Sequence, residues 1–446
     1  MLNVFVDQVQ ESWRSWSPFS QLIRRRTLLM IMKSHESMKT LGSLVKGAAL
    51  FSLISIFCVG CEYGAGGSNA NVALTSFVAI ADLNGDGQND LAVSKIEIQG
   101  APPHPGSISV LLQNPNAPGS FLPSTAYAAG ADPWFLVVRD LNADMLPDLI
   151  VANETGTISI LLQNPSSVGT FLNKTSIPTG DHPYSIAIDD LNGDNLLDLA
   201  VGRSSGVSLH FQRPDNHLDF LPAEEMPVDP ELGAHHVAIS DMDGDGYPDL
   251  VVSNAGEFFS DTNSLSGGSV SVFLQDGQSP GVFNPPITSA AADETQPFFL
   301  AIAELNGDGH PDLAVVNLGT PSNGYTASVS VLLQDSATPG AFSEPKDYPT
   351  GYRSQGVVIS DLDADAWPDL AVVNIGSVSV LLNDPVKPGS FLPANNYEGT
   401  DDYTAIAVGD LNADSQPDLA IAADGVPVMF QNLSAPGEFL PRTPVE

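Results

Sequence analysis

One acidic phrase occurs seven times in this chain, and it constrains the fold more than any other feature. The first copy runs from Asp82 to Val93 and reads DLNGDGQNDLAV. Repeats that recur every 50 residues or so predict one supersecondary unit per repeat, each burying its apolar surface against the next unit. The repeats fill residues 74–446. The later copies begin at Asp140, Asp190, Asp241, Glu304, Asp361 and Asp410.

Each repeat has the hydrophobic pattern of four short strands. In the second repeat we expect strands over Phe135–Val138, Leu149–Ala152 and Thr157–Leu162, and a fourth strand from Phe171. Four-stranded antiparallel sheets arranged around an axis form a ring with only short edges. No helical periodicity occurs beyond the amino-terminal segment. The sequence therefore predicts an all-β fold, a seven-bladed β-propeller of four-stranded antiparallel blades over residues 74–446.

The acidic phrase has the pattern of an oxygen-liganded cation site. Positions 1, 3, 5 and 9 carry carboxylates or amides, position 7 offers a backbone carbonyl, and hard oxygen ligands at this spacing suit Ca²⁺. A solvated turn is the alternative, because Asp, Asn and Gly are common turn residues, but seven matching copies favour metal. The candidate ligands are Asp82, Asn84, Asp86, Gln88, Asp90; Asp140, Asn142, Asp144, Asp148; Asp190, Asn192, Asp194, Leu196, Asp198; Asp241, Asp243, Asp245, Tyr247, Asp249; Glu304, Asn306, Asp308, His310, Asp312; Asp361, Asp363, Asp365, Asp369; and Asp410, Asn412, Asp414, Asp418.

The seven loops are not equivalent, because the turn at position 6 favours a residue that tolerates positive φ. Glycine or asparagine meets this need in four loops, whereas Met145, Ala366 and Ser415 do not. We expect the strongest sites in the loops that begin at Asp82, Asp190 and Asp241, a shifted site at Glu304, and weaker sites at Asp140, Asp361 and Asp410.

These repeats resemble the FG-GAP/VCBS repeats, which also form the head of integrin α-chains. The resemblance is carried by the D-x-[DN]-x-D-x-x-x-D loops, the L-[AIV]-V run that follows them, and P-G-x-F turns such as Gly389–Phe391 and Gly437–Phe439. It covers most of the chain. The resemblance implies a seven-bladed propeller with several structural calcium ions, one in the loop that joins the first two strands of a blade.

The net charge excludes some partners. The chain has 16 Lys and Arg against 53 Asp and Glu, a net charge of −37. Such a surface repels phosphate backbones and anionic lipid headgroups, so we expect no nucleic-acid partner and no membrane contact except through a lipid anchor. Bound divalent cations would relieve the self-repulsion of the carboxylates.

The amino-terminal segment has the order of a secretion signal. Residues 38–60 contain Lys39 and Lys46 followed by a short apolar run and small residues, as in a signal peptide. The ending Cys58-Val-Gly-Cys61 resembles a bacterial lipoprotein signal, which implies lipidation of Cys61; ordinary cleavage nearby is the alternative. We interpret residues 1–37 as a dispensable extension and residues 61–73 as a flexible tether. The expected product is secreted across the cytoplasmic membrane and lipid-anchored at the cell envelope or surface.

The face opposite the acidic loops is the expected partner-binding face. It receives the longest insertions, Lys95–Pro105, Ala255–Gly267 and Leu318–Thr326, and the mouth of the central channel. Aromatic and polar groups there can stack on sugars or bind a peptide, although packing between blades is the alternative role. Adjacent histidines on a strand are expected to point to opposite faces, which disfavours a shared zinc site. The candidate ligand-contacting residues are Trp134, Tyr184, His235, His236, Phe298 and Tyr403.

Enzyme motifs are missing from the sequence. It contains no HExxH, no G-x-S-x-G on a strand-turn-helix and no phosphate-binding glycine loop. The first hypothesis is a monomeric binding, adhesion or scaffolding module for an extracellular protein or glycan, with no catalytic residue. The alternative is an extracellular propeller enzyme that cleaves polysaccharide with carboxylates at the channel mouth.

Overall fold

The computed structural model describes residues 72–98, 103–214, 216–226, 228, 233–255, 257–259, 264–266, 268–291, 296–319, 326–399 and 402–445. The predicted extension, signal peptide and Cys61, and all but the last two residues of the tether, lie outside this part. The described part consists of strands, turns and loops, and it contains no helix that could cross a membrane.

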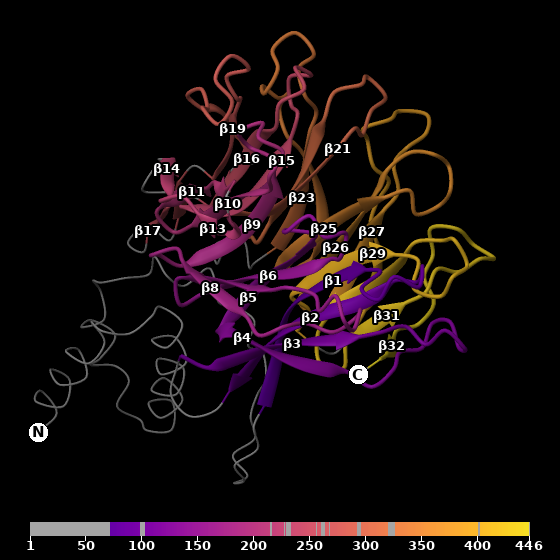
Figure 1. Cartoon of the computed structure of the whole chain (residues 1–446). Coiled ribbons are helices and arrows are strands. Elements are labelled where there is room, and N and C mark those ends of the chain that lie inside the picture. The colour runs from indigo at the N-terminus through magenta and orange to yellow at the C-terminus, as the bar shows by residue number, and fades with distance from the viewer. Residues whose placement is uncertain are drawn as a thin grey trace, which may run out of the picture.

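Seven four-stranded antiparallel sheets are arranged around one axis, which confirms the predicted seven-bladed propeller (Figure 1). The four strands of each blade follow one another along the chain. The blades are β1 (Val72–Ala81), β2 (Asp90–Ile98), β3 (Pro105–Leu111), β4 (Thr125–Ala131); β5 (Pro133–Arg139), β6 (Asp148–Asn153), β7 (Thr157–Leu161), β8 (Thr175–Pro178); β9 (Pro183–Asp189), β10 (Asp198–Arg203), β11 (Gly206–His210), β14 (Glu224–Met226); β15 (Ala234–Ser240), β16 (Asp249–Asn254), β19 (Ser269–Phe273), β20 (Ile287–Ala290); β21 (Pro297–Ala303), β22 (Asp312–Asn317), β23 (Thr326–Leu332), β24 (Lys346–Tyr352); β25 (Ser354–Ser360), β26 (Asp369–Asn374), β27 (Ser377–Leu381), β28 (Asn395–Glu398); and β29 (Ala405–Gly409), β30 (Asp418–Ala422), β31 (Pro427–Met429), β32 (Thr443–Pro444).

Two additional hairpins interrupt this regular pattern. β12 (Gln212–Arg213) pairs with β13 (Asn216–Phe220) within the third blade, and β17 (Glu257–Phe259) pairs with β18 (Ser264–Ser266) in the second of the predicted insertions.

The predicted start of the fourth strand at Phe171 is wrong. Phe171 forms an isolated bridge with Gln163, and β8 begins at Thr175. The Phe171 side chain is buried and packs edge-on against Tyr127 of the preceding blade, with ring centroids 5.4 Å apart. Phe171 therefore belongs to the contact between blades, and regular strand pairing resumes only after it.

The hydrophobic core lies between the blades. The second strand of the second blade, β6, is buried along its whole length, as a continuous apolar run predicts. Side chains of neighbouring blades share each cluster: Val78 and Leu91 of the first blade pack with Ala420 and Val428 of the last. Burial of each Val or Leu stabilises the ring by about 1.5–3 kcal/mol.

The ring closes without an exchanged strand. β1 packs beside β29, and Figure 1 shows the indigo first blade next to the yellow last blade. The Asn89 side chain donates to the Asp410 carbonyl at 3.0 Å, and the Gln113 side chain donates to the Leu411 carbonyl at 2.8 Å. Both bonds join the first blade to the acidic loop of the last blade, so this loop is part of the closure.

Candidate metal loops and channel mouth

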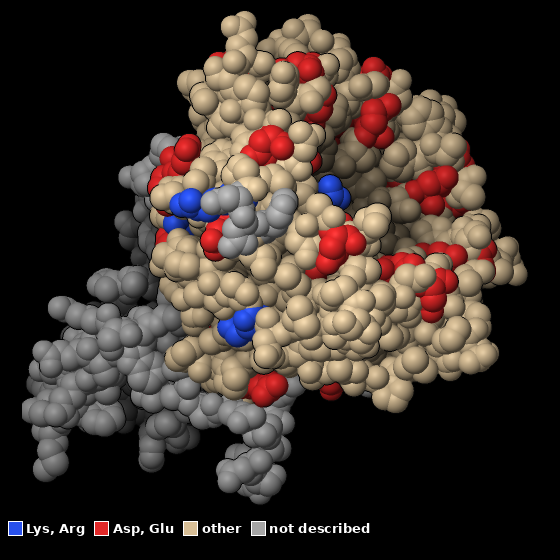
Figure 2. All heavy atoms as spheres, viewed as in Figure 1, with Lys and Arg blue, Asp and Glu red and all other residues tan. Residues whose placement is uncertain are grey.

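The acidic loops join the first and second strands of each blade and share a hydrogen-bond pattern. In the first loop the Asp82 carboxylate accepts from the backbone N–H of Gly85 at 2.7 Å and of Gly87 at 2.8 Å. The Asp86 carboxylate accepts from the N–H of Gln88 at 2.9 Å. These bonds curl the chain around the carboxylates of positions 1 and 5. Figure 2 shows acidic side chains in separate groups over the visible face, with few basic side chains between them.

Two positions of each loop have positive φ. Position 6 is predicted to require it, and position 4 has it as well, with φ from 59° at Ala143 to 84° at Gly307. The sequence signal for position 4 was its restriction to Gly or Ala. A non-glycine residue in this region costs roughly 1–2 kcal/mol, so the loops that begin at Asp140, Asp361 and Asp410 each contain two strained residues. The non-glycine residues concerned are Ala143, Met145, Asn195, Ala364, Ala366, Ala413 and Ser415.

The aspartate at position 9 connects each loop to the third strand of its blade. Asp90 is fully buried, and its two oxygens accept from the N–H of Leu83 at 2.9 Å and of Gln113 at 2.7 Å. The same pair of bonds occurs in all seven loops, at 2.7 to 3.0 Å. Burial raises the pKa of these carboxyls from 3.8 to about 6, or to about 7 for Asp198 and Asp369. Sequence reasoning treated position 9 only as a metal ligand and missed this second role.

In two loops three carboxylates converge closely enough to hold a metal ion. Their oxygens lie within 4.8 Å of one another. Both loops have Asp rather than Asn at position 3, and burial with the neighbouring carboxylates raises the pKa of that residue. One of these loops was predicted to be strong and the other weak. The two groups are Asp241 with Asp243 and Asp249, and Asp361 with Asp363 and Asp369.

Five of the loops are also covered by the turn of the next blade. The turn glycine Gly389 lies against Asn306, at position 3 of the preceding loop: a Cβ on Gly389 would be 2.9 Å from the Asn306 Cβ. The Trp367 indole, at position 7 of its own loop, lies over Gly307 of the preceding loop at a similar distance. Acidic loop and glycine turn therefore recur together because they pack on each other. The same contact joins Gly119 to Asn412, Gly169 to Asn84, Gly281 to Asn192 and Gly437 to Asp363.

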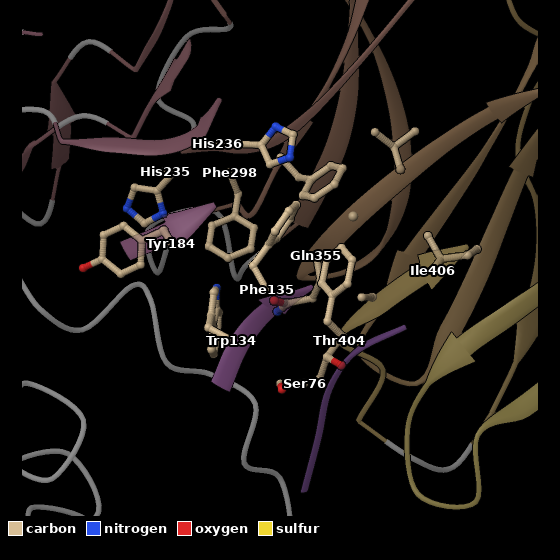
Figure 3. A pocket seen from close by; sticks show the side chains of 15 residues that line it. Ser76, Trp134, Phe135, Tyr184, His235, His236, Phe298, Gln355, Thr404 and Ile406 are labelled. Carbon is tan, nitrogen blue, oxygen red and sulfur yellow. The ribbon is translucent and has the colours of Figure 1, made fainter. Parts of the chain in front are cut away.

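The opposite end of the inner strands forms the channel mouth, a pocket to which all seven blades contribute (Figure 3). Six inner strands have a register shift in their pairing, which lies at the first residues of the strand except in β1, and the extra residue at each shift lines the pocket. A bulge of this kind turns the strand locally and redirects its side chains. The first lining residues of the seven blades are Ser76, Trp134, Tyr184, His235, Phe298, Gln355 and Thr404.

The structure brings most of the predicted ligand-contacting residues together. Trp134, Tyr184, His235, His236 and Phe298 all line the channel mouth. Both histidines line the pocket, but their rings contact different partners: His235 lies against Tyr184 and Phe298, and His236 lies against Phe135 and Phe299. In the described residues no third His, Cys, Asp or Glu joins them in a metal-binding group.

Tyr403 is a core residue and does not line the channel mouth. Its side chain is 2% exposed and packs with Ile406 and Val378 in the cluster between the last two blades. Its hydroxyl accepts a hydrogen bond from Arg442. The strand that follows, β29, has regular pairing without a bulge, so Tyr403 is not redirected toward the channel.

The aromatic side chains pack on one another across the channel. Tyr184 stacks on His235, with ring centroids 5.0 Å apart and planes at 11°, and His235 lies 5.4 Å from Phe298. In the layer below, His236 lies 3.9 Å from Phe299. Burial lowers the pKa of His235 to about 4 and of His236 to about 3, so both are neutral at pH 7. The fifteen lining residues therefore carry no formal charge in a protein of net charge −37.

The channel mouth has an aromatic side and a polar side. Blades two to five contribute most of the large rings, whereas blades six, seven and one contribute the polar Gln355, Thr404 and Ser76 and the small Gly356 and Ala405, together with Val357, Ile406 and Phe77. The small residues leave a cavity of about 40 Å³, room for about three water molecules. Sequence reasoning placed Gln355 near the mouth but missed Ser76 and Thr404; they occupy the same repeat position as Trp134, and that position was the available signal.

Fold and loops together define a class, the seven-bladed propellers with an acidic turn in every blade. The chain belongs to the FG-GAP repeat family. The model of the FG-GAP-like repeat matches more than half of the chain, and the model of the FG-GAP repeat matches 234–273. The matches to the first model cover 82–150, 140–201, 190–252, 305–372 and 361–421.

Known proteins share part of the sequence or the fold. Integrin alpha-7 of Homo sapiens is 32% identical over 146 residues, which are 31% of this chain and 12% of the integrin. Integrin alpha-6 of Gallus gallus is 32% identical over 149 residues, 31% of this chain and 13% of the integrin. The chain thus spans about an eighth of these relatives. A structure from Bacteroides uniformis described as a candidate 6-phosphogluconolactonase covers 72% of this chain and 85% of its own, with a TM-score of 0.51 at 14% identity, and shows a shared fold alone.

Proposed function

We propose that this chain is a secreted, surface-anchored adhesion or binding module whose channel mouth contacts an extracellular protein or glycan. The observation that carries the proposal is the uncharged aromatic pocket at the mouth, set in a strongly acidic protein. Apolar pockets with a few placed polar groups are the usual form of a binding site. The likeness to integrin α-chains supports a binding role and an extracellular or surface location.

The acidic loops are proposed to hold structural calcium. Carboxylate and carbonyl oxygens are the ligands that Ca²⁺ prefers, and the two converging carboxylate groups have this chemistry. Bound cations would offset the strain at positions 4 and 6 and the repulsion between carboxylates. Because these loops lie at the far end of the inner strands from the mouth, their calcium would support the blades and would not contact the ligand.

Terbium, a luminescent substitute for calcium, tests this proposal through Trp367. The Trp367 indole lies between the loops that begin at Glu304 and Asp361, so excitation of tryptophan is expected to sensitise Tb³⁺ emission that excess Ca²⁺ removes. Trp367→Phe should remove most of the emission. Trp134→Phe, at the other end of the inner strands, is the matched control and should keep it. Unchanged emission in Trp367→Phe would contradict metal binding at these loops.

The binding role predicts that one face selects the partner. We expect the calcium-loaded protein to capture a ligand on arrays of extracellular proteins and glycans, and Trp134→Ala to lower the affinity at least tenfold, because aromatic anchors dominate such contacts. Val386→Ser, a change at a 90% exposed residue in a turn at the other end of the blades, is the control. Cleavage of a polysaccharide that Trp134→Ala abolishes would instead support the enzyme alternative.

A further inference from the structure

We propose that the channel mouth binds one uncharged carboxamide, the side chain of an Asn or Gln residue in a protein partner. This inference rests on the proposed function, because it takes the mouth to be the binding site. It adds the chemical class of the group that enters, and it favours a protein over a glycan.

The first observation is the side chain of Gln355. It is 6% exposed, yet its carboxamide makes no hydrogen bond to the residues that the structure describes. Figure 3 shows this amide pointing into the pocket, toward the aromatic side chains. The amide N–H groups of Gln113 and Asn374, in contrast, donate within the propeller: Gln113 to two backbone carbonyls and Asn374 to two serine hydroxyls. The Gln355 amide lines the pocket and has no partner among the described residues, so it is a group that a ligand can satisfy.

The second observation is the imidazole of His236 in the same pocket. His236 is 7% exposed, and its Nδ1 is buried without a hydrogen-bond partner among the described residues. The ring is held between Phe299, at 3.9 Å, and Phe135, at 5.6 Å, and the His236 backbone N–H donates to Ser253. One small aromatic pocket therefore contains two polar side chains with unused hydrogen-bonding capacity.

The polar groups on the rim are already in use. The Ser76 hydroxyl lies 2.6 Å from the Pro133 carbonyl, and the Thr404 hydroxyl lies 3.1 Å from the Ala422 carbonyl, so each donates to backbone. Gln355 is therefore the donor left for a ligand on the polar side of the mouth.

The size of the pocket and the absence of charge in its lining both favour a carboxamide as the ligand group. A charged group would lose its water in a pocket whose lining residues offer no counter-charge. A cavity of about 40 Å³ holds about three waters, which matches the carbon, oxygen and nitrogen of a carboxamide and is too small for a sugar ring. A carboxamide is planar, fits beside aromatic faces, and can form two antiparallel hydrogen bonds with the Gln355 amide.

Saturation-transfer NMR on the full chain tests the proposal with small probes. The probes are N-acetyl-asparagine N-methylamide and its glutamine analogue, compared with the capped lysine and capped aspartate analogues and with glucose. We expect saturation transfer to the two carboxamides and at least tenfold weaker binding in Gln355→Leu. Gln296→Leu replaces a similarly buried glutamine outside the pocket and should leave binding unchanged.

Two results would overturn the proposal: stronger binding of the capped lysine or of glucose than of either carboxamide, or equal carboxamide binding by Gln355→Leu and the wild type. If Gln355→Leu fails to fold, as thermal unfolding would reveal, Gln355→Glu serves as the second variant and should also lose the carboxamides. An array partner that binds Gln355→Leu as well as wild type would contradict the carboxamide proposal while leaving the binding module intact. If the carboxamides bind but the chain captures no partner on the arrays, the carboxamide proposal stands and the binding-module proposal is contradicted.

Discussion

Replacing Asp369 with alanine is expected to lower the free energy of unfolding by about 4 kcal/mol, because two buried backbone N–H groups lose their acceptor. The Asp369 oxygens accept from the N–H of Leu362 at 2.8 Å and of Asn383 at 2.7 Å, and the side chain is fully buried. Urea unfolding in the presence of a chelator measures this effect separately from any effect of metal. The loss should therefore persist when no calcium is bound.

Asp365→Ala in the same loop is the matched control. Asp365 also carries a carboxylate, but it accepts from the single N–H of Trp367 and is only partly buried. In the presence of a chelator we expect Asp365→Ala to lower the free energy of unfolding by less than about 1 kcal/mol. If both variants lower the free energy of unfolding equally, position 9 does not act as a link between the loop and the third strand.

The metal-free protein is expected to lose stability as the pH rises from about 4 to 7. Burial raises the pKa of the seven position-9 carboxyls to about 6 or 7. In this window the folded state binds more protons than the unfolded state, so the free energy of unfolding falls with pH. Deprotonation also increases the net negative charge, which acts in the same direction. Below pH 4 both states are protonated and this penalty is absent.

Calcium should reverse this pH dependence. Carboxylates bind Ca²⁺ in their ionised form, so affinity rises with pH, and an ion that binds only the folded state stabilises it by mass action. Melting temperatures between pH 4 and 8, in excess calcium and in chelator, check both statements. We expect the two curves to separate as the pH rises, by on the order of 10 °C at pH 7. Coincident curves would contradict the calcium proposal, and a metal-free curve that rises with pH would contradict the raised pKa values.

The blades were predictable from the sequence because their pattern is local and repeated. The run after each acidic loop, such as Leu149–Ala152, is apolar at every position, and the structure buries all of it. The start of the fourth strand was not predictable in the same way. Phe171 reads as a strand residue, but its burial against Tyr127 of another blade depends on a contact that no local pattern contains.

The channel mouth was predictable in composition and not in geometry. Pro-aromatic pairs marked the inner strand starts, whereas the bulges that bring both His235 and His236 to the pocket depend on pairing with a strand almost 20 residues later. The same limit explains why Ser76, the extra residue at the register shift of β1, was missed. The second role of position 9 likewise depends on a bond from Asp90 to Gln113, 23 residues away.

The closure of the ring has a consequence for how such a protein can be rearranged. Each blade is one continuous piece of chain, and the boundary between the last and first blades is made of the same kinds of side-chain contact as the other boundaries. The boundary between the last and first blades is therefore one of seven similar boundaries. A circular permutant that joins the present ends with a linker and begins at another blade boundary would keep all seven sheets intact.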